Sequence, residues 1–372
     1  MKVVVATDKW RGSFGSREAG AALAAGLARA LPGVSPEVVE VADGGEGTVA
    51  AVLARAPRGE RRVARVTGPR GAGVEAAWAV LPKGRALIEI AAAAGHALLA
   101  PAERDPLVTT TRGVGELVGA ALDAGCAEVA LALGGSATVD GGAGMARALG
   151  FRLVDRAGRE LPPGGGALAE LDRIDATGAD RRLSATCVEA WCDVTNPLVG
   201  GAGAARVFGP QKGATPEAVE RLEAGLVRLA EVVERDLGVA IAALPSAGAA
   251  GGLAGAAAAF LGARLVLGAE RVLDAIGFDV LLAGADLVVT GEGRFDGRAM
   301  PGKAPLVVAE RAMRLGLPVV LACGEDVSGG AAGLGLGAIF SGRDLGRAGG
   351  ERLSAADLEH IGALAARFAR RR

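Results

Sequence analysis

Short apolar runs alternate with longer amphipathic stretches at both ends of the chain. Residues 3–6 have the pattern of a buried strand, and helical spacing over 17–31 follows Ser16, a residue type that caps helices. A strand at 38–41 and a helix through Leu53 come next. Near the end the pattern predicts a strand at 287–290, a helix at 306–315, strands at 319–322 and 338–340, and an Arg-rich terminal helix. This alternation is typical of a parallel sheet covered by helices.

The middle of the chain follows a different pattern. Three strands joined by short turns are predicted at 62–67, 74–81 and 86–90, which favours a meander. The sequence then predicts a helix at 113–124, a strand at 129–133, a hairpin over 151–162, a strand at 188–192 and an amphipathic helix at 216–237. Similar units at both ends around a dissimilar middle indicate one α/β domain inserted into another.

Length and charge narrow the class of protein. The 372 residues are about twice the usual size of one domain, and 51% apolar residues are enough for a large core. Lys and Arg number 41 against 42 Asp and Glu, so the net charge is −1. We therefore expect no general attraction to nucleic acid or to an anionic membrane. Any anion must be held by a local site.

The cysteine pattern favours a reducing compartment. None of the four cysteines forms a CxxC pair, and only two histidines could add ligands, so we expect no zinc site. The chain starts with a strand pattern rather than an apolar leader, and we expect a cytoplasmic protein. The uncharged stretch 244–263 is mostly Ala and Gly, which predicts a packed helix rather than a membrane span.

Glycine clusters at the predicted strand ends are the main candidates for chemistry. DGGEGT at 43–48, GGSATVDGG at 134–142 and TGEGRFD at 290–296 each combine glycine with acidic side chains. Exposed N–H groups at such loops bind phosphate or carboxylate, and open α/β sheets bind ligands at the carboxyl ends of their strands. The alternative interpretation is ordinary turns. It explains the run 329–337 well and these acidic loops poorly.

A spacing like that of a P-loop occurs at 297–303. Ala304 stands where the Mg²⁺-binding hydroxyl of that motif belongs, and the acidic loop separates the motif from its strand, so we reject a true Walker A loop. Lys303 is either a phosphate contact at a helix start or a solvated lysine. No GxGxxG follows a strand, which leaves a dinucleotide-binding fold without support.

Two further polar loops follow the predicted strand at 188–192. Residues 193–198 read DVTNPL, and residues 208–213 read FGPQKG. Asp193 with Asp296 or Glu292 could hold Mg²⁺, which needs only one or two protein carboxylates. The alternative is a pair of Asx and Pro turns. His96 follows an Ala-rich stretch and reads as a packed residue rather than a catalyst.

At these motifs the sequence resembles the bacterial type I glycerate kinases, in one order over about four-fifths of the chain. The similar segments are DKWRGS at 8–13, ADGGEGT at 42–48, GGSATVDGG at 134–142, CDVTNPL at 192–198, VFGPQKGA at 207–214, AAGG at 249–252 and TGEGRFD at 290–296. Arg11 stands where the family usually has Lys and keeps a cation there; Lys9 and Arg298 are further departures.

The resemblance implies a flavodoxin-like domain made of residues 1–62 and 286–372. It also implies an inserted mixed α/β domain, likened to restriction-enzyme folds, at 63–285. The implied activity is ATP- and Mg²⁺-dependent phosphorylation of D-glycerate, usually at the 2-hydroxyl, by a monomer or a homodimer.

Our hypothesis for the site combines the loops with this resemblance. Asp193 or Asp43 accepts the proton of the attacking hydroxyl, and Arg11 assists. The proposed glycerate contacts are Arg11, Ser13, Asp43, Gly44, Gly45, Ser136 and Asn196. The proposed ATP contacts are Gly209, Gln211, Lys212, Gly291, Gly293 and Lys303, and the proposed Mg²⁺ ligands are Asp193, Glu292 and Asp296. Two alternatives stay open: a kinase for another small hydroxy acid, and a non-catalytic sensor of glycerate or a nucleotide.

Overall fold

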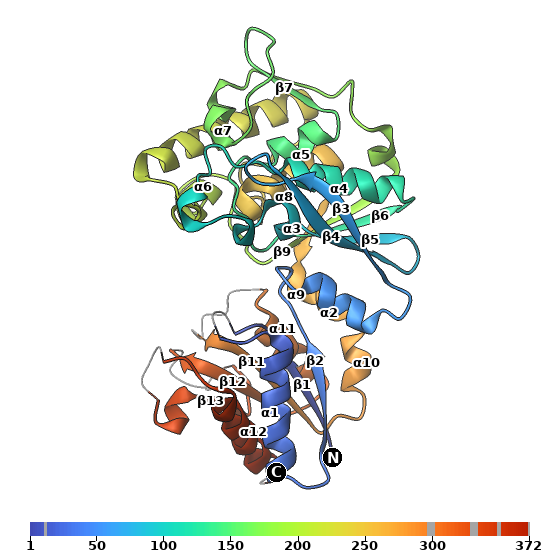
Figure 1. Ribbon diagram of the computed structural model, residues 1–372, viewed down its shortest axis with the longest axis vertical. Helices are drawn as coiled ribbons and strands as arrows, with labels where there is room; N and C mark the ends of the chain where they lie inside the picture. Colours follow the sequence, from blue (N-terminus) through green and yellow to red (C-terminus); the bar gives the residue numbers. More distant parts are fainter. Residues whose placement is uncertain (11–12, 296–301, 328–333, 348–350, 371–372) are drawn as a thin grey trace. The chain divides into compact units, whose positions relative to one another are not determined.

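The computed structural model describes residues 1–10, 13–295, 302–327, 334–347 and 351–370 (Figure 1). The chain forms two compact units. The first combines Met1–Asp43 with Ala269–Arg372, and the second is Gly44–Gly268. The domain limits given by the resemblance, 62/63 and 285/286, stay a prediction.

The first unit is built on a five-stranded parallel sheet. Its order is β13-β12-β11-β1-β2, which in chain order of these strands is the 2-1-3-4-5 arrangement of flavodoxin-like folds. The strands are β1 (Lys2–Thr7), β2 (Ser35–Glu40), β11 (Leu287–Phe295), β12 (Val319–Asp326) and β13 (Ala338–Ser341). The parallel flavodoxin-like sheet expected from both chain ends is therefore confirmed.

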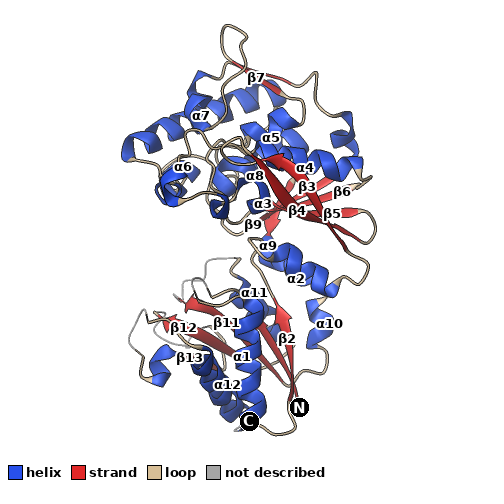
Figure 2. Ribbon diagram, viewed as in Figure 1, coloured by secondary structure: helices blue, strands red, loops and turns tan. Residues whose placement is uncertain are grey.

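Helices cover both faces of this sheet. Val3, Val5 and Val289 form one core with side chains of α1 (Ser16–Ala30) and α12 (Ala355–Arg370), which run side by side (Figures 1 and 2). The alternate residues Val4 and Val288 are also fully buried, and α11 (Ala304–Arg314) packs on the same strands. Because successive side chains point to opposite faces, α11 covers the second face. The short helices α9 (Gly268–Ala275) and α10 (Phe278–Leu282) precede β11.

Two local predictions for the first unit were wrong. Strand β11 was expected to end at Thr290, yet it runs to Phe295 because β12 also continues and keeps pairing with it, Arg294 opposite Glu325. Ser16 was expected to cap α1, but Gly15 is the N-cap residue. The Ser16 hydroxyl donates instead to the carbonyl of Thr7, and it ties the start of α1 to the end of β1.

The second unit contains a mixed six-stranded sheet in the order β10-β9-β6-β5-β4-β3. The predicted meander is confirmed as the antiparallel strands β3 (Glu60–Thr67), β4 (Gly73–Leu81) and β5 (Arg85–Glu89). Strands β6 (Glu128–Ala132), β9 (Cys187–Cys192) and β10 (Arg264–Leu267) add to β5 in parallel. The helices are α2 (Thr48–Arg55), α3 (Ala91–Ala94), α4 (Arg112–Asp123), α5 (Ala143–Ala148), α6 (Ala204–Phe208), α7 (Pro216–Leu237) and α8 (Leu253–Leu261).

The hairpin expected at 151–162 forms only in part. Strand β7 (Arg152–Val154) pairs with β8 (Arg173–Asp175) rather than with the residues that follow the turn. The expected hairpin partner contributes one β-bridge, between Val154 and Glu160. In the part of the chain that the structure describes, no helix is long and apolar enough to cross a membrane.

The contact between α1 and α12 depends on glycine. A Cβ atom on Gly26 would overlap the backbone carbonyl of Glu359, and one on Gly362 would overlap that of Leu23. We predict that Gly26→Ala lowers the stability of the first unit by about 1–3 kcal/mol, the usual cost of overpacking. Thermal unfolding followed by circular dichroism measures the change.

Gly119→Ala is the matched control. Gly119 also lies inside a helix, and a Cβ atom there meets nothing within 4 Å. Its expected effect is a gain of up to about 1 kcal/mol from helix propensity. Equal midpoints for Gly26→Ala and the wild type would contradict the close packing of α1 on α12.

Candidate functional site

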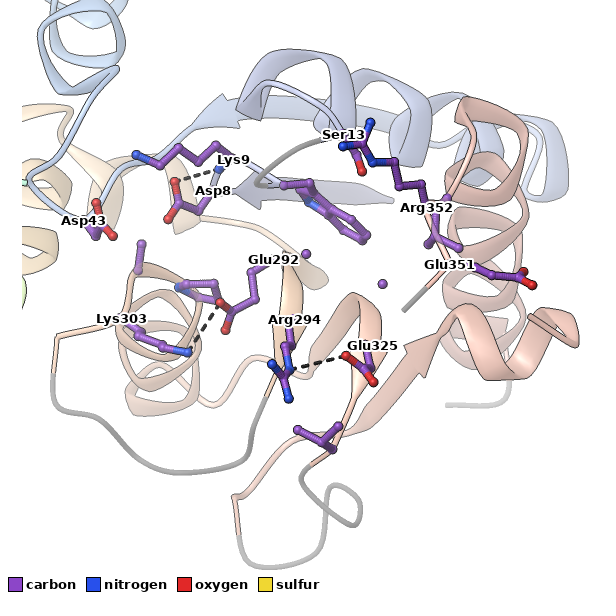
Figure 3. A pocket seen from close by; sticks show the side chains of 17 residues that line it. Asp8, Lys9, Ser13, Asp43, Glu292, Arg294, Lys303, Glu325, Glu351 and Arg352 are labelled. Atoms are coloured by element: carbon purple, nitrogen blue, oxygen red, sulfur yellow. Dashed lines mark hydrogen bonds and ion pairs between the residues drawn. The ribbon is translucent and has the colours of Figure 1, made fainter. Parts of the chain in front are cut away.

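A cavity of about 890 Å³ opens at the carboxyl ends of the strands of the first unit (Figure 3). Asp8 and Ser13 come after β1, Asp43 after β2, Glu292 from the end of β11 and Glu325 from the end of β12. The strand order reverses between β1 and β11, and this is the point of an open α/β sheet at which ligands bind.

Asp8 directly follows β1 in the sequence, and its carboxylate lies between two other carboxylates. Its backbone N–H donates to the carbonyl of Gly291 at 3.2 Å, which continues the pairing of β1 with β11. One carboxylate oxygen accepts the N–H of Lys9 at 2.7 Å. Burial raises the pKa of Asp8 to about 7, and the negative charges of Asp43 and Glu292 add to this shift. The cavity therefore concentrates negative charge at the junction of β1 and β11.

Cations stand opposite these acids. Lys303 is the N-cap residue of α11, and its Nζ lies 3.7 Å from Oε2 of Glu292 (Figure 3). Arg294 pairs with Glu325 at 3.3 Å. At the start of α11, Ala304 carries a backbone N–H, whereas Pro305 has none and Leu306 donates to the carbonyl of Lys303 at 3.1 Å. The positive end of the helix faces the same side of the cavity.

Acids outnumber cations along the described lining. The carboxylates are Asp8, Asp43, Glu292, Glu325 and Glu351, and the cations are Lys9, Arg294, Lys303 and Arg352. Such a lining suits an anion that arrives with its own cation rather than a bare anion. Within the described residues, no three His, Cys, Asp or Glu side chains converge to hold a metal ion. Mg²⁺ remains compatible, since one or two carboxylates and substrate phosphates are enough for it.

A second polar cluster lies in the other unit, in the segments that follow β5, β6 and β9 in the sequence. Lys212 is only 3% exposed, and its Nζ donates to Oγ of Ser136 at 2.7 Å and to the carbonyl of Thr138 at 2.8 Å. Burial lowers the pKa of Lys212 to about 7, while Asp140 and Asp193 act in the opposite direction. These two hydrogen bonds anchor the glycine loop 134–142 to the buried amine of Lys212.

Asp140 is fully buried in the same loop. It accepts hydrogen bonds from the N–H and hydroxyl of Thr111 at 2.8 and 2.9 Å, and from the N–H groups of Gly142 and Gly144 at 3.1 and 3.2 Å. Burial raises its pKa against these four donors. The aspartate of this motif therefore organises the backbone of the loop.

The structure sorts the predicted site residues by unit. Ser13, Asp43, Glu292, Gly293 and Lys303 share the cavity of the first unit. Gly291 lies within β11, where a Cβ atom would overlap the carbonyl of Ala322. Arg11 and Asp296 lie outside the described residues, as does 297–301 of the P-loop-like segment.

The remaining predicted residues belong to the second unit. Gly44 packs on the backbone of Trp191, and a Cβ atom on Gly134 would overlap Cα of Gly45. Asn196 donates to the carbonyl of Ala202 at 2.8 Å, as in a turn. Asp193, which follows β9, is half-buried, Gln211 is exposed, and Gly209 precedes the short 3₁₀ helix Pro210–Lys212.

Sequence reasoning missed several residues of the cavity. Asp8, Trp10, Arg294, Glu325 and Arg352 line it but were given no role. Only Asp8 carried a readable signal, because it is an acid placed directly after a buried strand. Arg294 and Glu325 could not be found, since Arg294 was placed in a loop and Glu325 lay beyond the strand predicted at 319–322, so their pairing was not foreseen.

Fold and cavity together define an α/β protein with a candidate site at the strand ends of a flavodoxin-like sheet. The sequence model of the glycerate kinase family matches residues 3–356. A glycerate kinase of Bacillus subtilis (strain 168) is 46% identical over 86% of this chain and 84% of its own length. A glycerate 2-kinase of Escherichia coli (strain K12) is 45% identical over 92% of this chain and 90% of its own length.

A solved structure agrees with these relatives. The crystal structure of a protein named as glycerate kinase 2 from Salmonella typhimurium LT2 matches with a TM-score of 0.83 and 42% identity, over 100% of this chain and 98% of that chain. The chain belongs to the glycerate kinase family. It is therefore a kinase.

The raised pKa of Asp8 predicts a pH-dependent gain from Asp8→Asn. A carboxyl with a folded-state pKa near 7 and an unfolded-state pKa near 4 loses stabilisation as the pH rises between these values. We expect Asp8→Asn to match the wild type at pH 4 and below, to gain on it progressively as the pH rises, and to exceed it by about 1–2 kcal/mol above pH 7, because partial exposure screens the full shift. Thermal unfolding from pH 4 to 8 measures this difference.

Glu351→Gln is the control for this measurement. Glu351 lines the same cavity but is exposed, so its removal should leave the pH profile unchanged. A difference between Asp8→Asn and the wild type that does not grow with pH would show that Asp8 is ordinarily ionised.

Proposed function

We propose that the protein transfers the γ-phosphoryl group of ATP to the 2-hydroxyl of D-glycerate, forming 2-phosphoglycerate. The observation that carries this proposal is the cavity at the strand ends of the first unit, where an excess of carboxylates faces Lys303 and the start of α11. Membership of the glycerate kinase family and the likeness to a glycerate 2-kinase support the substrate and the position of transfer.

The first unit is suited to the phosphates and to Mg²⁺. Lys303, the backbone N–H of Ala304 at the start of α11 and the backbone of Gly293 would contact the phosphates, as helix starts do in other phosphate sites. Glu292 would hold Mg²⁺, with Asp8 beside it; Asp296 and Asp193 stay candidates from the sequence. The ion would neutralise the charge that builds up on the transferred phosphoryl group.

The second unit supplies the remaining candidates. Lys212 was expected to contact ATP phosphates, but its buried amine already donates to Ser136 and Thr138. We therefore propose that Lys212 shapes the glycine loop next to the acceptor. Asp193 or Asp43 would accept the proton of the attacking hydroxyl, and Gly209, Gln211, Gly44, Gly45 and Asn196 remain proposed contacts.

The cysteines support a proposal about location. Cys126, Cys187, Cys192 and Cys323 are free thiols. Unpaired cysteines are typical of a reducing compartment, and we propose a cytoplasmic location. Monomer and homodimer are both compatible with this function.

A phosphorus NMR spectrum of the reaction with ATP, Mg²⁺ and D-glycerate tests the proposed function. We expect the signals of ADP and 2-phosphoglycerate to grow together while the γ-phosphate signal of ATP declines. Asp193→Asn should reduce this rate by at least ~10²-fold, at the lower end of general-base effects.

Other outcomes would overturn parts of the proposal. A 3-phosphoglycerate signal would move the transfer to the other hydroxyl. Product from a related hydroxy acid but not from glycerate would indicate a kinase of different specificity. Ligand-induced thermal stabilisation without any ADP would indicate a sensor.

A further inference from the structure

Several buried polar atoms near Lys212 have no hydrogen-bond partner among the described residues. Within the described residues, Nδ1 of His96, Nε of Arg104 and Oγ1 of Thr138 are buried and have no hydrogen-bond partner. Unpaired buried polar groups are costly, and each such group in a native protein indicates a water, an ion or a ligand. Three of them beside a buried lysine call for an explanation.

Backbone contacts bring these residues to one place. The N–H of His96 donates to the carbonyl of Gly135 at 3.0 Å, and Gly95 forms a β-bridge with Ser136. Ser136 in turn accepts the Lys212 amine. The backbone of Arg104 packs on Gly213, the residue after Lys212. His96, Arg104 and Lys212 therefore surround the same glycine loop.

Arg104 is the permanent cation of this place. Burial lowers the pKa of His96, and the nearby positive charges of Lys212 and Arg104 lower it further, so His96 lies near both groups and favours its neutral, hydrogen-bonding form. The acids nearby are Asp140 and Asp193. Asp140 already accepts four hydrogen bonds, from Thr111, Gly142 and Gly144, and none of them comes from His96, Arg104 or Thr138.

Exposed residues flank the cluster along the chain. Gly135, Gln211 and Gly213 are exposed, while the Ser136, Thr138 and Lys212 side chains next to them are buried. The unused atoms of His96, Arg104 and Thr138 are themselves closed to solvent, so a small ligand would reach them only past the glycine backbone beside them. Fixed donors and cations of this kind suit a carboxylate.

We propose that His96, Arg104 and the Thr138 hydroxyl, held in place by Lys212, bind the carboxylate of the hydroxy-acid acceptor. This inference rests on the proposed function and moves the carboxylate from Arg11 and Ser13 to the second unit. It also gives His96, which the sequence favoured as a packed residue, a ligand. Arg104 supplies charge, and Thr138 supplies a neutral donor.

The test compares D-glycerate with glycerol, which has the same carbon chain but no carboxylate. We expect Arg104→Met to lower kcat/KM for glycerate by about 10- to 100-fold, mainly through KM, and to leave the rate with glycerol at its wild-type value. Arg104→Lys should restore part of the loss. Arg70→Met is the control, because Arg70 is an exposed arginine that donates to the neighbouring Glu103 carbonyl.

A second variant keeps the inference testable if Arg104→Met fails to fold. Thr138→Val removes only the hydroxyl, and we expect a higher KM for glycerate with no loss of thermal stability, because the hydroxyl has no protein partner among the described residues. An unchanged KM in both variants, or an equal loss for glycerate and glycerol, would overturn the inference.

The failure of the proposed function would look different. In that case the wild type would not phosphorylate glycerate at all, and calorimetric titration of D-glycerate without nucleotide would replace the kinetic assay. Binding to the wild type that Arg104→Met weakens would keep the carboxylate site. The absence of any binding to the wild type would remove it.

Discussion

The parallel register of β1 with β2 and β11 is the constraint on which the proposed chemistry depends. Because these strands run the same way and end at the same edge, Asp8, Asp43 and Glu292 are delivered to one cavity whether or not their charges are compatible. Burial raises the pKa of Asp8, and the nearby charges of Asp43 and Glu292 raise it further. Backbone pairing over β1 and its two neighbours holds carboxylates together that would otherwise separate.

The second unit also holds charged side chains close together, but it buries them in a hydrogen-bonded cluster. Asp140 and Lys212 are both removed from water. Asp140 accepts hydrogen bonds from Thr111, Gly142 and Gly144, and Lys212 donates to Ser136 and Thr138 of the glycine loop 134–142. Breaking such a buried set by removing one member is costly, whereas the complete set fixes one conformation of the loop. The loop is thereby rigid before a ligand arrives, and rigid donors lose little entropy on binding.

The sequence was informative where local pattern decides structure. Alternating and helical spacings located most strands and the longer helices, and α7 begins and ends at its predicted residues, whereas the short elements β8, β10, α3, α5, α6, α9 and α10 were not predicted. The extension of β11 through Phe295 was missed, because it depends on the partner strand β12 rather than on the glycine-rich segment itself. The flavodoxin-like order of the strands came from the family resemblance and not from any spacing.

Site residues were predicted unevenly for a similar reason. Acids and glycines at strand ends identified Asp43, Glu292 and Lys303, which lie along one cavity. Burial could not be read from the sequence, so Lys212 was interpreted as a contact for phosphate although its amine is enclosed. His96 and Arg104 lie in no motif, and only the tertiary contacts of Ser136 and Gly213 relate them to Lys212.

The central claim is that the cavity of the first unit accepts an anion together with its cation. Calorimetric titration of ATP into the full chain, once with Mg²⁺ and once with a chelator, tests this most directly. The account predicts binding at least ~10-fold tighter with Mg²⁺, and a smaller gain in Glu292→Gln. Equal affinity for ATP in the presence of the chelator would contradict it.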